Sequence, residues 1–181
     1  MTNAQSSVAN EEDLRSSVAN EEDLRSFREV FLEGVDEEFK KSQQNTTLIK
    51  KEKYHLIIKT LQDTNSTIHS KYKWKKKFMV VRVAGEDILF KPKDVTEEGK
   101  ICSDNEIDAL LDRKQYVHTE QLFGIIHSAH RMRSHVKSWN LHKHLQNKYV
   151  NIPRNLCELY VNNCSQCNTY VQRKKIRAGY N

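Results

Sequence analysis

The chain has 181 residues, of which 30% are charged and 37% are hydrophobic, and its formal net charge is +6. This length allows one ordinary domain or two small ones, and the thin apolar supply favours small modules over one large core. No stretch is long and apolar enough to span a membrane, the polar N-terminus excludes a secretory signal, and four cysteines with one close pair do not form a disulfide framework. We therefore expect a soluble intracellular protein.

The N-terminal segment is acidic, whereas the rest of the chain is basic. Residues 1–40 hold eleven acidic and four basic side chains, so the remainder carries a net +13. A basic body favours a polyanionic partner, although lysine-rich surfaces also aid solubility. Residues 6–15 recur without change as residues 16–25, and two copies are too few for a solenoid. We expect residues 1–26 to be a disordered or weakly helical acidic tail.

Residues 27–100 are expected to form a small module of helices and a β-hairpin. The apolar positions from Phe27 to Phe39 and from Tyr54 to Leu61 recur at helical spacing, which predicts two amphipathic helices. Val81–Val83 and Ile88–Phe90 flank the turn-forming residues 84–87, which predicts two strands.

A cluster of lysines interleaved with aromatic residues precedes this hairpin. On a strand, residues 71–77 would place Tyr72 and Trp74 on one face and the cations on the other. This arrangement suits contact with phosphates and stacking on bases, while the alternative is a core face with solvated lysines opposite. The expected phosphate contacts are Lys71, Lys73, Lys75, Lys76 and Lys77.

Residues 101–177 are expected to form a second, helical module, followed by a short tail at residues 178–181. Ser103 and Glu106 have capping-box spacing and predict a short helix over residues 107–111. Further helices are expected after a Thr119 cap, around Trp139, and after Pro153. His118, His142 and His144 are expected at the surface or on helix faces. The predicted fold class is α+β, with a helix and hairpin module before a three-helix module.

Four residues of the types that bind metals occur in two close pairs within the second module. Four residues separate His130 from His135, and two separate Cys164 from Cys167. Structural Zn²⁺ takes four N or S donors in tetrahedral geometry and often draws them from two such pairs. The spacing therefore predicts a closed Zn²⁺ site, and His127 is the alternative first ligand.

The order of these ligands, with the residues around them, resembles the zinc-binding HHCC domain of retroviral and gypsy-type retrotransposon integrases. The likeness is closer still to domesticated host copies such as KRAB-A domain-containing proteins. It rests on Leu122-Phe123 before the histidines, on the stretch from Tyr149 to Arg154, on the CxxC pair, and on the basic residues that follow it. It covers roughly residues 115–177 and places His130, rather than His127, in the ligand position.

The resemblance implies a DNA-binding or assembly module without catalysis. In the family, strand transfer belongs to a following acidic core, and no Asp or Glu follows Cys167 in this chain, so we expect no enzymatic activity. We expect non-specific DNA binding, possible self-association, no membrane partner, and a nuclear rather than cytoplasmic location. The alternative is a domesticated or truncated host protein that uses the module for protein contacts. The tail residues expected to contact DNA are Arg173, Lys174, Lys175 and Arg177.

The region around the second histidine departs from the family. Glycines usually flank this residue, whereas here His135 lies between Ser134 and Val136. The sequence therefore predicts a stiffer backbone at this ligand.

Overall fold

The computed structural model describes most of the chain. The described ranges are residues 8–41, 47–65, 67–93, 98, 100–102 and 113–168. Side chains in the first helix are described from Glu22 onward.

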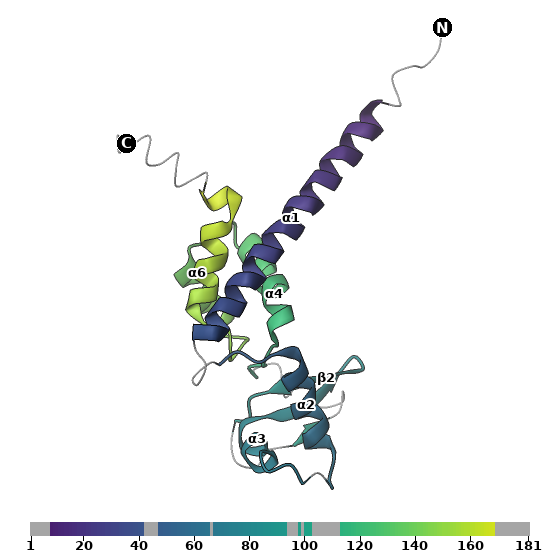
Figure 1. Ribbon diagram of the computed structural model, residues 1–181, viewed down its shortest axis with the longest axis vertical. Helices are drawn as coiled ribbons and strands as arrows, with labels where there is room; N and C mark the ends of the chain where they lie inside the picture. Colours follow the sequence, from purple (N-terminus) through teal and green to yellow (C-terminus); the bar gives the residue numbers. More distant parts are fainter. Residues whose placement is uncertain are drawn as a thin grey trace.

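Helices dominate the architecture, and a small sheet completes an α+β fold, as predicted (Figure 1). None of the described helices is long and apolar enough to cross a membrane. In chain order the elements are α1 (Val8–Lys41), α2 (Lys51–Gln62), α3 (Lys71–Lys77), β1 (Met79–Val83), β2 (Glu86–Phe90), β3 (Ile101–Cys102), α4 (Thr119–Met132), α5 (Ser138–Leu145) and α6 (Arg154–Asn163).

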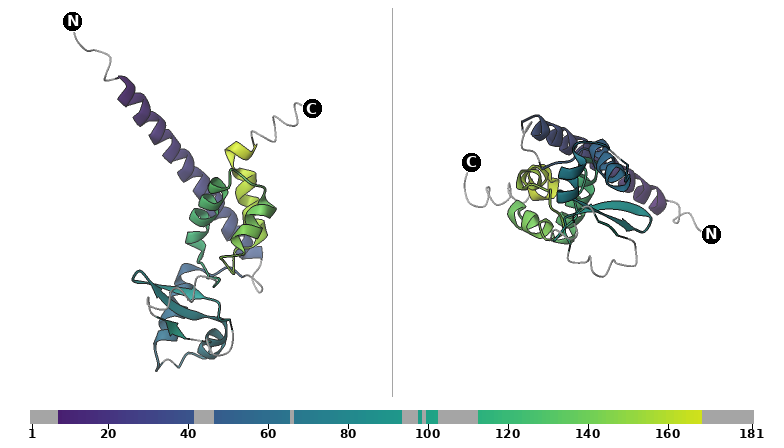
Figure 2. Two further views of the ribbon diagram at one scale, coloured as in Figure 1. Left: turned by 180° about the vertical axis from the view of Figure 1, so that it is seen from behind. Right: turned by 90° about the horizontal axis from the view of Figure 1, so that it is seen from below.

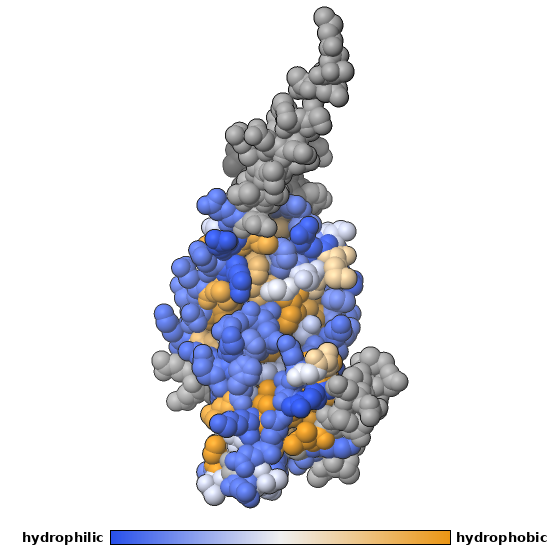
Figure 3. All heavy atoms as spheres, turned by 90° about the vertical axis from the view of Figure 1, so that its right-hand side faces the viewer, coloured by the Kyte–Doolittle hydropathy of each residue, from blue (hydrophilic) through white to orange (hydrophobic). Residues whose placement is uncertain are grey.

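Two units can be separated by their cores. The helical unit consists of α4, α5, α6 and the C-terminal half of α1, and the mixed unit consists of α2, α3 and the sheet. Figure 2 shows the two units stacked end to end, with the N-terminal half of α1 extending past the helices beside it. The surface is mostly hydrophilic on the face drawn in Figure 3, with apolar patches scattered among the polar residues.

Helix α1 runs through most of the segment expected to be a tail, because it begins at Val8 within the first copy of the repeat. Its buried residues Phe31 and Val35 pack into the helical unit rather than against the hairpin. A Cβ atom on Gly34 would lie 2.5 Å from Cδ2 of Leu159, so the glycine lets α1 approach α6 closely. The grouping of residues 27–100 into one module therefore differs from the packing, which joins α1 to the later helices.

The sheet has the order β2-β1-β3, with β1 antiparallel to β2 and parallel to β3. Ala84 and Gly85 have positive φ values of 50° and 85°, as required in the tight turn of a two-residue hairpin. The register pairs Met79 with Phe90 and Val83 with Glu86. The predicted hairpin is confirmed, with both strands longer than expected.

The expected strand at residues 71–77 is wrong, since this segment forms helix α3. Trp74 packs against the core of the mixed unit, whereas Tyr72 is 68% exposed. Residues two apart share one face of a strand, but they lie about 200° apart around a helix. The two aromatic rings therefore do not share a face.

The segment from Gln115 to His118 connects the two units. Tyr116 donates its backbone N–H to Leu89, at 2.7 Å, and Thr119 donates to Ile49, at 3.0 Å. The buried Asn151 side chain forms two bonds to Val117, accepting its N–H at 2.9 Å and donating to its carbonyl at 2.7 Å. The Asn151 amide thus ties the loop before α6 to the connecting segment.

Several helix ends differ in detail from expectation. Helix α4 begins at Thr119 but is capped by His118, whose backbone N–H donates to the Gln121 side chain. His118 is only 9% exposed, so its expected surface position is wrong: its ring packs against Tyr54 of the mixed unit. Pro153 precedes α6, as expected. The capping box at residues 103–106 and the helix at 107–111 lie outside the described residues.

Candidate metal centre

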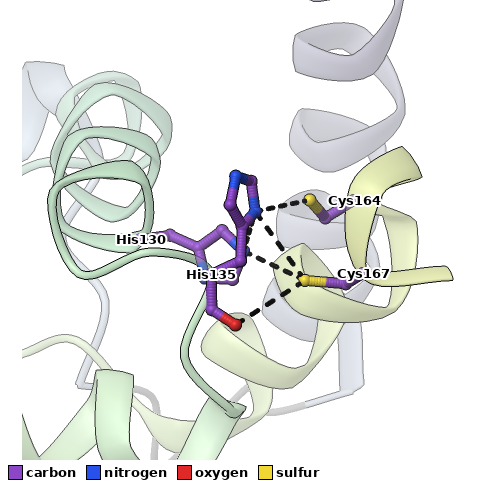
Figure 4. A group of neighbouring side chains, drawn as sticks. All are labelled: His130, His135, Cys164 and Cys167. Carbon is purple, nitrogen blue, oxygen red and sulfur yellow. Dashed lines mark hydrogen bonds between the residues drawn. The ribbon is translucent and has the colours of Figure 1, made fainter. Parts of the chain in front are cut away.

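The four predicted ligand residues come together at one end of the helical unit. Figure 4 shows the imidazole rings of His130 and His135 facing the thiols of Cys164 and Cys167. One donor atom from each residue lies within 4.8 Å of all the others, and among the described residues no other group of this kind is found. The cluster contains two nitrogen and two sulfur donors, and no carboxylate belongs to it.

The donors come from α4, the loop after it, the end of α6 and the turn that follows α6. His130 lies in the last turn of α4 and is fully buried. His135 follows in the loop before α5, while Cys164 ends α6 and Cys167 lies in the helical turn of residues 165–168. The Cys164 carbonyl accepts the N–H of Asn168 at 3.0 Å, which holds the CxxC segment in one turn.

The distances between donor atoms fit a tetrahedral metal ion. Bond lengths of about 2.05 Å to nitrogen and 2.3 Å to sulfur give tetrahedral edges of about 3.3 Å for N to N and about 3.6 Å for N to S. Here Nε2 of His130 lies 3.0 Å from Nδ1 of His135. The Cys167 sulfur lies 3.3 Å from Nε2 of His130, and the Cys164 sulfur lies 3.4 Å from Nδ1 of His135. These distances, with all four donors within 4.8 Å of one another, mean that the four residues can hold a metal ion.

The ligand loop has an unusual backbone conformation. Ser134 and His135 have positive φ values of 53° and 60°, in the left-handed region that favours glycine. The His135 N–H donates to the His130 carbonyl at 3.0 Å, so the turn also closes the end of α4. Flanking glycines would adopt this conformation without strain. Ser134 and His135 adopt it at a strain cost of about 1 kcal/mol or more per residue.

Burial favours the neutral forms of His130 and Cys167. The pKa of His130 is lowered to about 4, first by desolvation and then by His135 and His127. The pKa of the Cys167 thiol is raised to about 11, first by desolvation and then by a hydrogen bond with Cys164. Thiolates are the form that binds metals, so metal binding must displace protons at this site.

His127, the alternative first ligand, lies outside the cluster. Its Nδ1 atom is 2.7 Å from the Tyr160 hydroxyl, and its ring stacks on Phe123. The buried Tyr160 ring in turn packs edge-on against His130, with the ring centroids 5.3 Å apart. Tyr160 thus packs directly against the candidate ligand His130, and His127 bonds to Tyr160. The spacing of the residues alone did not indicate this role.

The expected nucleic-acid residues occupy a separate place in the structure. Lys73, Lys75, Lys76 and Lys77 are exposed on α3, whereas Lys71 is half-buried and donates to backbone carbonyls of the preceding loop. Lys76 lies over the Tyr72 ring, 4.8 Å from its centroid. The structure does not bring these lysines to the metal cluster, and the tail residues Arg173, Lys174, Lys175 and Arg177 lie outside the described residues.

One similar protein comes from the comparison with curated sequences. The chain is 28% identical over 145 residues to the human protein "KRAB-A domain-containing protein 2", a match that covers 78% of this chain. The chain corresponds to only 27% of the length of that protein. No protein-family model matches the chain. No solved structure matches it either.

Proposed function

We propose that His130, His135, Cys164 and Cys167 bind one Zn²⁺ as a closed structural site. The observation that carries this proposal is a group of two nitrogen and two sulfur donors at nearly tetrahedral spacing. A set of two histidines and two cysteines in tetrahedral geometry is typical of structural zinc. When bound, the ion would join α4, the following loop and the end of α6.

The same donor set argues against a catalytic metal. Catalytic zinc usually keeps three protein ligands and an open position for water, often beside a carboxylate. Here four protein donors would fill the tetrahedron, and Glu158, the nearest carboxylate in sequence to the cysteines, pairs with Arg154 at 2.8 Å. We therefore propose a non-catalytic module.

We further propose that this module derives from a retrotransposon integrase and binds DNA without sequence preference, alone or in support of assembly during DNA integration. Its support is the order of the ligands together with the exposed lysines of α3. Lysine contacts to phosphates release counterions, which makes the affinity depend strongly on salt.

A second candidate is a host protein that uses the zinc module for protein contacts. The observation that favours it is the similarity to a human protein named for its KRAB-A domain, of which this chain corresponds to about a quarter. In that case the lysines of α3 serve solubility, and the chain has no affinity for DNA.

Duplex binding at several salt concentrations separates the two candidates. We expect two unrelated duplexes to bind the zinc-loaded chain with similar affinity and with a negative salt slope. Replacing Lys73, Lys75 and Lys77 by Gln should flatten that slope by roughly 0.9 for each phosphate that the variant no longer neutralises. The matched control replaces Lys40, Lys53 and Lys59, which are exposed on α1 and α2. Undetectable duplex binding at low salt would reject the DNA-binding candidate.

A further inference from the structure

The corner between α4 and α5 carries a dense, uncompensated positive charge. The sequence contains no Asp or Glu from Gln121 to Cys157. Within this stretch, Arg131, Arg133, Lys137 and Lys143 are exposed on the last turn of α4, the loop and α5. No carboxylate in the described part of the chain pairs with any of these four cations. The charge is therefore available to an anionic partner.

An exposed tryptophan occurs in the same stretch of the chain and contacts one of these cations. Trp139, near the start of α5, is 55% exposed. Nζ of Lys143 lies over its ring, 5.3 Å from the centroid. Helix α5 is on the opposite side of the helical unit from α1, so no described helix covers this face (Figure 2). An exposed indole among cations is the combination that single-strand-binding proteins use to stack bases and track phosphates.

The metal centre fixes the shape of this corner. His135 belongs to the metal-ligand group, and its left-handed backbone sets the direction in which the chain enters α5. Lys137 and Trp139 follow that residue by two and four positions. A bound metal would therefore hold the cations and the indole in one arrangement, which lowers the cost of ordering them on binding.

We propose that Arg131, Arg133, Lys137, Trp139 and Lys143, the corner surface, bind single-stranded nucleic acid. The four cations contact phosphates, and an unpaired base stacks on the Trp139 indole. Stacking on an exposed side chain needs a base that is free of its own duplex, so a single strand fits this surface better than a duplex. The inference rests on the proposed nucleic-acid function and assigns a second surface, distinct from the lysines of α3.

The test uses the full zinc-loaded chain and a fluorescein-labelled oligothymidine, with a duplex of equal length for comparison. We expect the single strand to bind more tightly than the duplex. Trp139→Ala should weaken single-strand binding roughly 5- to 100-fold and leave duplex binding nearly unchanged. Trp139→Phe should retain most of the affinity, and Tyr72→Ala, at the exposed aromatic of α3, is the matched control. Because the Trp139 ring is exposed, zinc content and helicity should stay at the wild-type level.

Intrinsic fluorescence gives a second readout. Trp74 is the other tryptophan, so a Trp74→Phe background leaves Trp139 as the reporter, and the oligothymidine should quench its emission. Equal affinity for strand and duplex, or single-strand affinity unchanged by Trp139→Ala, would overturn the corner surface. Equally tight binding of polyglutamate would also overturn it, because the surface would then be a general anion contact. The proposed DNA function would survive each result if the wild-type chain still bound duplex and the α3 variant still flattened the salt slope. Absence of all nucleic-acid binding would reject both proposals.

Discussion

The helical unit contains a compact group of metal-ligand side chains, whereas the described residues of the mixed unit contain none. The mixed unit instead fixes its parts through the sheet and through Tyr54, whose buried hydroxyl accepts the N–H of Leu89 at 2.9 Å. Both units are too small for a large core. We therefore expect the helical unit to depend on a bound ion and the mixed unit to depend on apolar packing.

Metal removal should produce the largest difference between the units. Structural zinc contributes roughly 10 to 16 kcal/mol of apparent binding free energy, so chelation or Cys164→Ser should unfold α4, α5 and α6. The sheet should keep its protected amides, as measured by hydrogen exchange. Cys157→Ala is the matched control, because Cys157 is a buried thiol with a pKa raised to about 12, outside the cluster. Simultaneous loss of protection in both units would contradict the separation.

A cavity in the core of the mixed unit should destabilise that unit and leave the metal site intact. Ile57 is 1% exposed in α2, and Ile57→Ala should cost about 2 to 5 kcal/mol of the free energy of unfolding of the mixed unit. Zinc content should stay at the wild-type level. The neighbouring Leu56 is 47% exposed, so Leu56→Ala should change little. Denaturant unfolding followed by metal analysis measures both quantities, and zinc loss in Ile57→Ala would argue against independent units.

The connection between the units should be weaker than either core. Asn151→Ala removes two hydrogen bonds to Val117 and leaves its buried backbone groups without that partner, at a cost of about 2 to 3 kcal/mol. We expect the melting transitions of the two units to move further apart in calorimetry than they are in the wild type. Asn140→Ala, at an exposed position on α5, should leave the transitions unchanged. An Asn151→Ala chain that melts like the wild type would show that this amide does not join the units.

The smallest expected effect concerns the ligand loop. Ser134→Gly should stabilise the zinc-loaded chain by about 0.5 to 1 kcal/mol, because glycine adopts the positive φ without strain. Ser128→Gly, within helix α4, should destabilise it by about 0.5 kcal/mol. Urea unfolding of both variants measures the change in the free energy of unfolding, which should have opposite signs in the two. A destabilised Ser134→Gly chain would mean that the loop is not strained.

The ligand cluster and the hairpin were predictable from the sequence because both depend on local patterns. Two close pairs of ligand residues need only one turn each, and Gly85 marks a tight turn between apolar runs. The metal-ligand group formed as predicted, with His130 in it and His127 outside it. The identity of the ion and the DNA contacts remain predictions.

The remaining features depend on contacts between distant segments. Alternating aromatic residues at Tyr72 and Trp74 fit a strand, and only packing of Trp74 against the core of the mixed unit distinguishes the short helix. Trp139 fits an apolar stripe by type, yet α5 buries Leu141 and Leu145 and leaves the indole outside. His118 is buried by Tyr54, a residue 64 positions away, which no local pattern reveals.

Zinc content per chain tests the central claim most directly. Native mass spectrometry of the purified chain should find one Zn²⁺, lost in Cys164→Ser and in His130→Ala and retained in His127→Ala. This result follows if the donors that lie within 4.8 Å of one another are the ligands. Unchanged zinc content in both Cys164→Ser and His130→Ala, or loss in His127→Ala alone, would contradict the account.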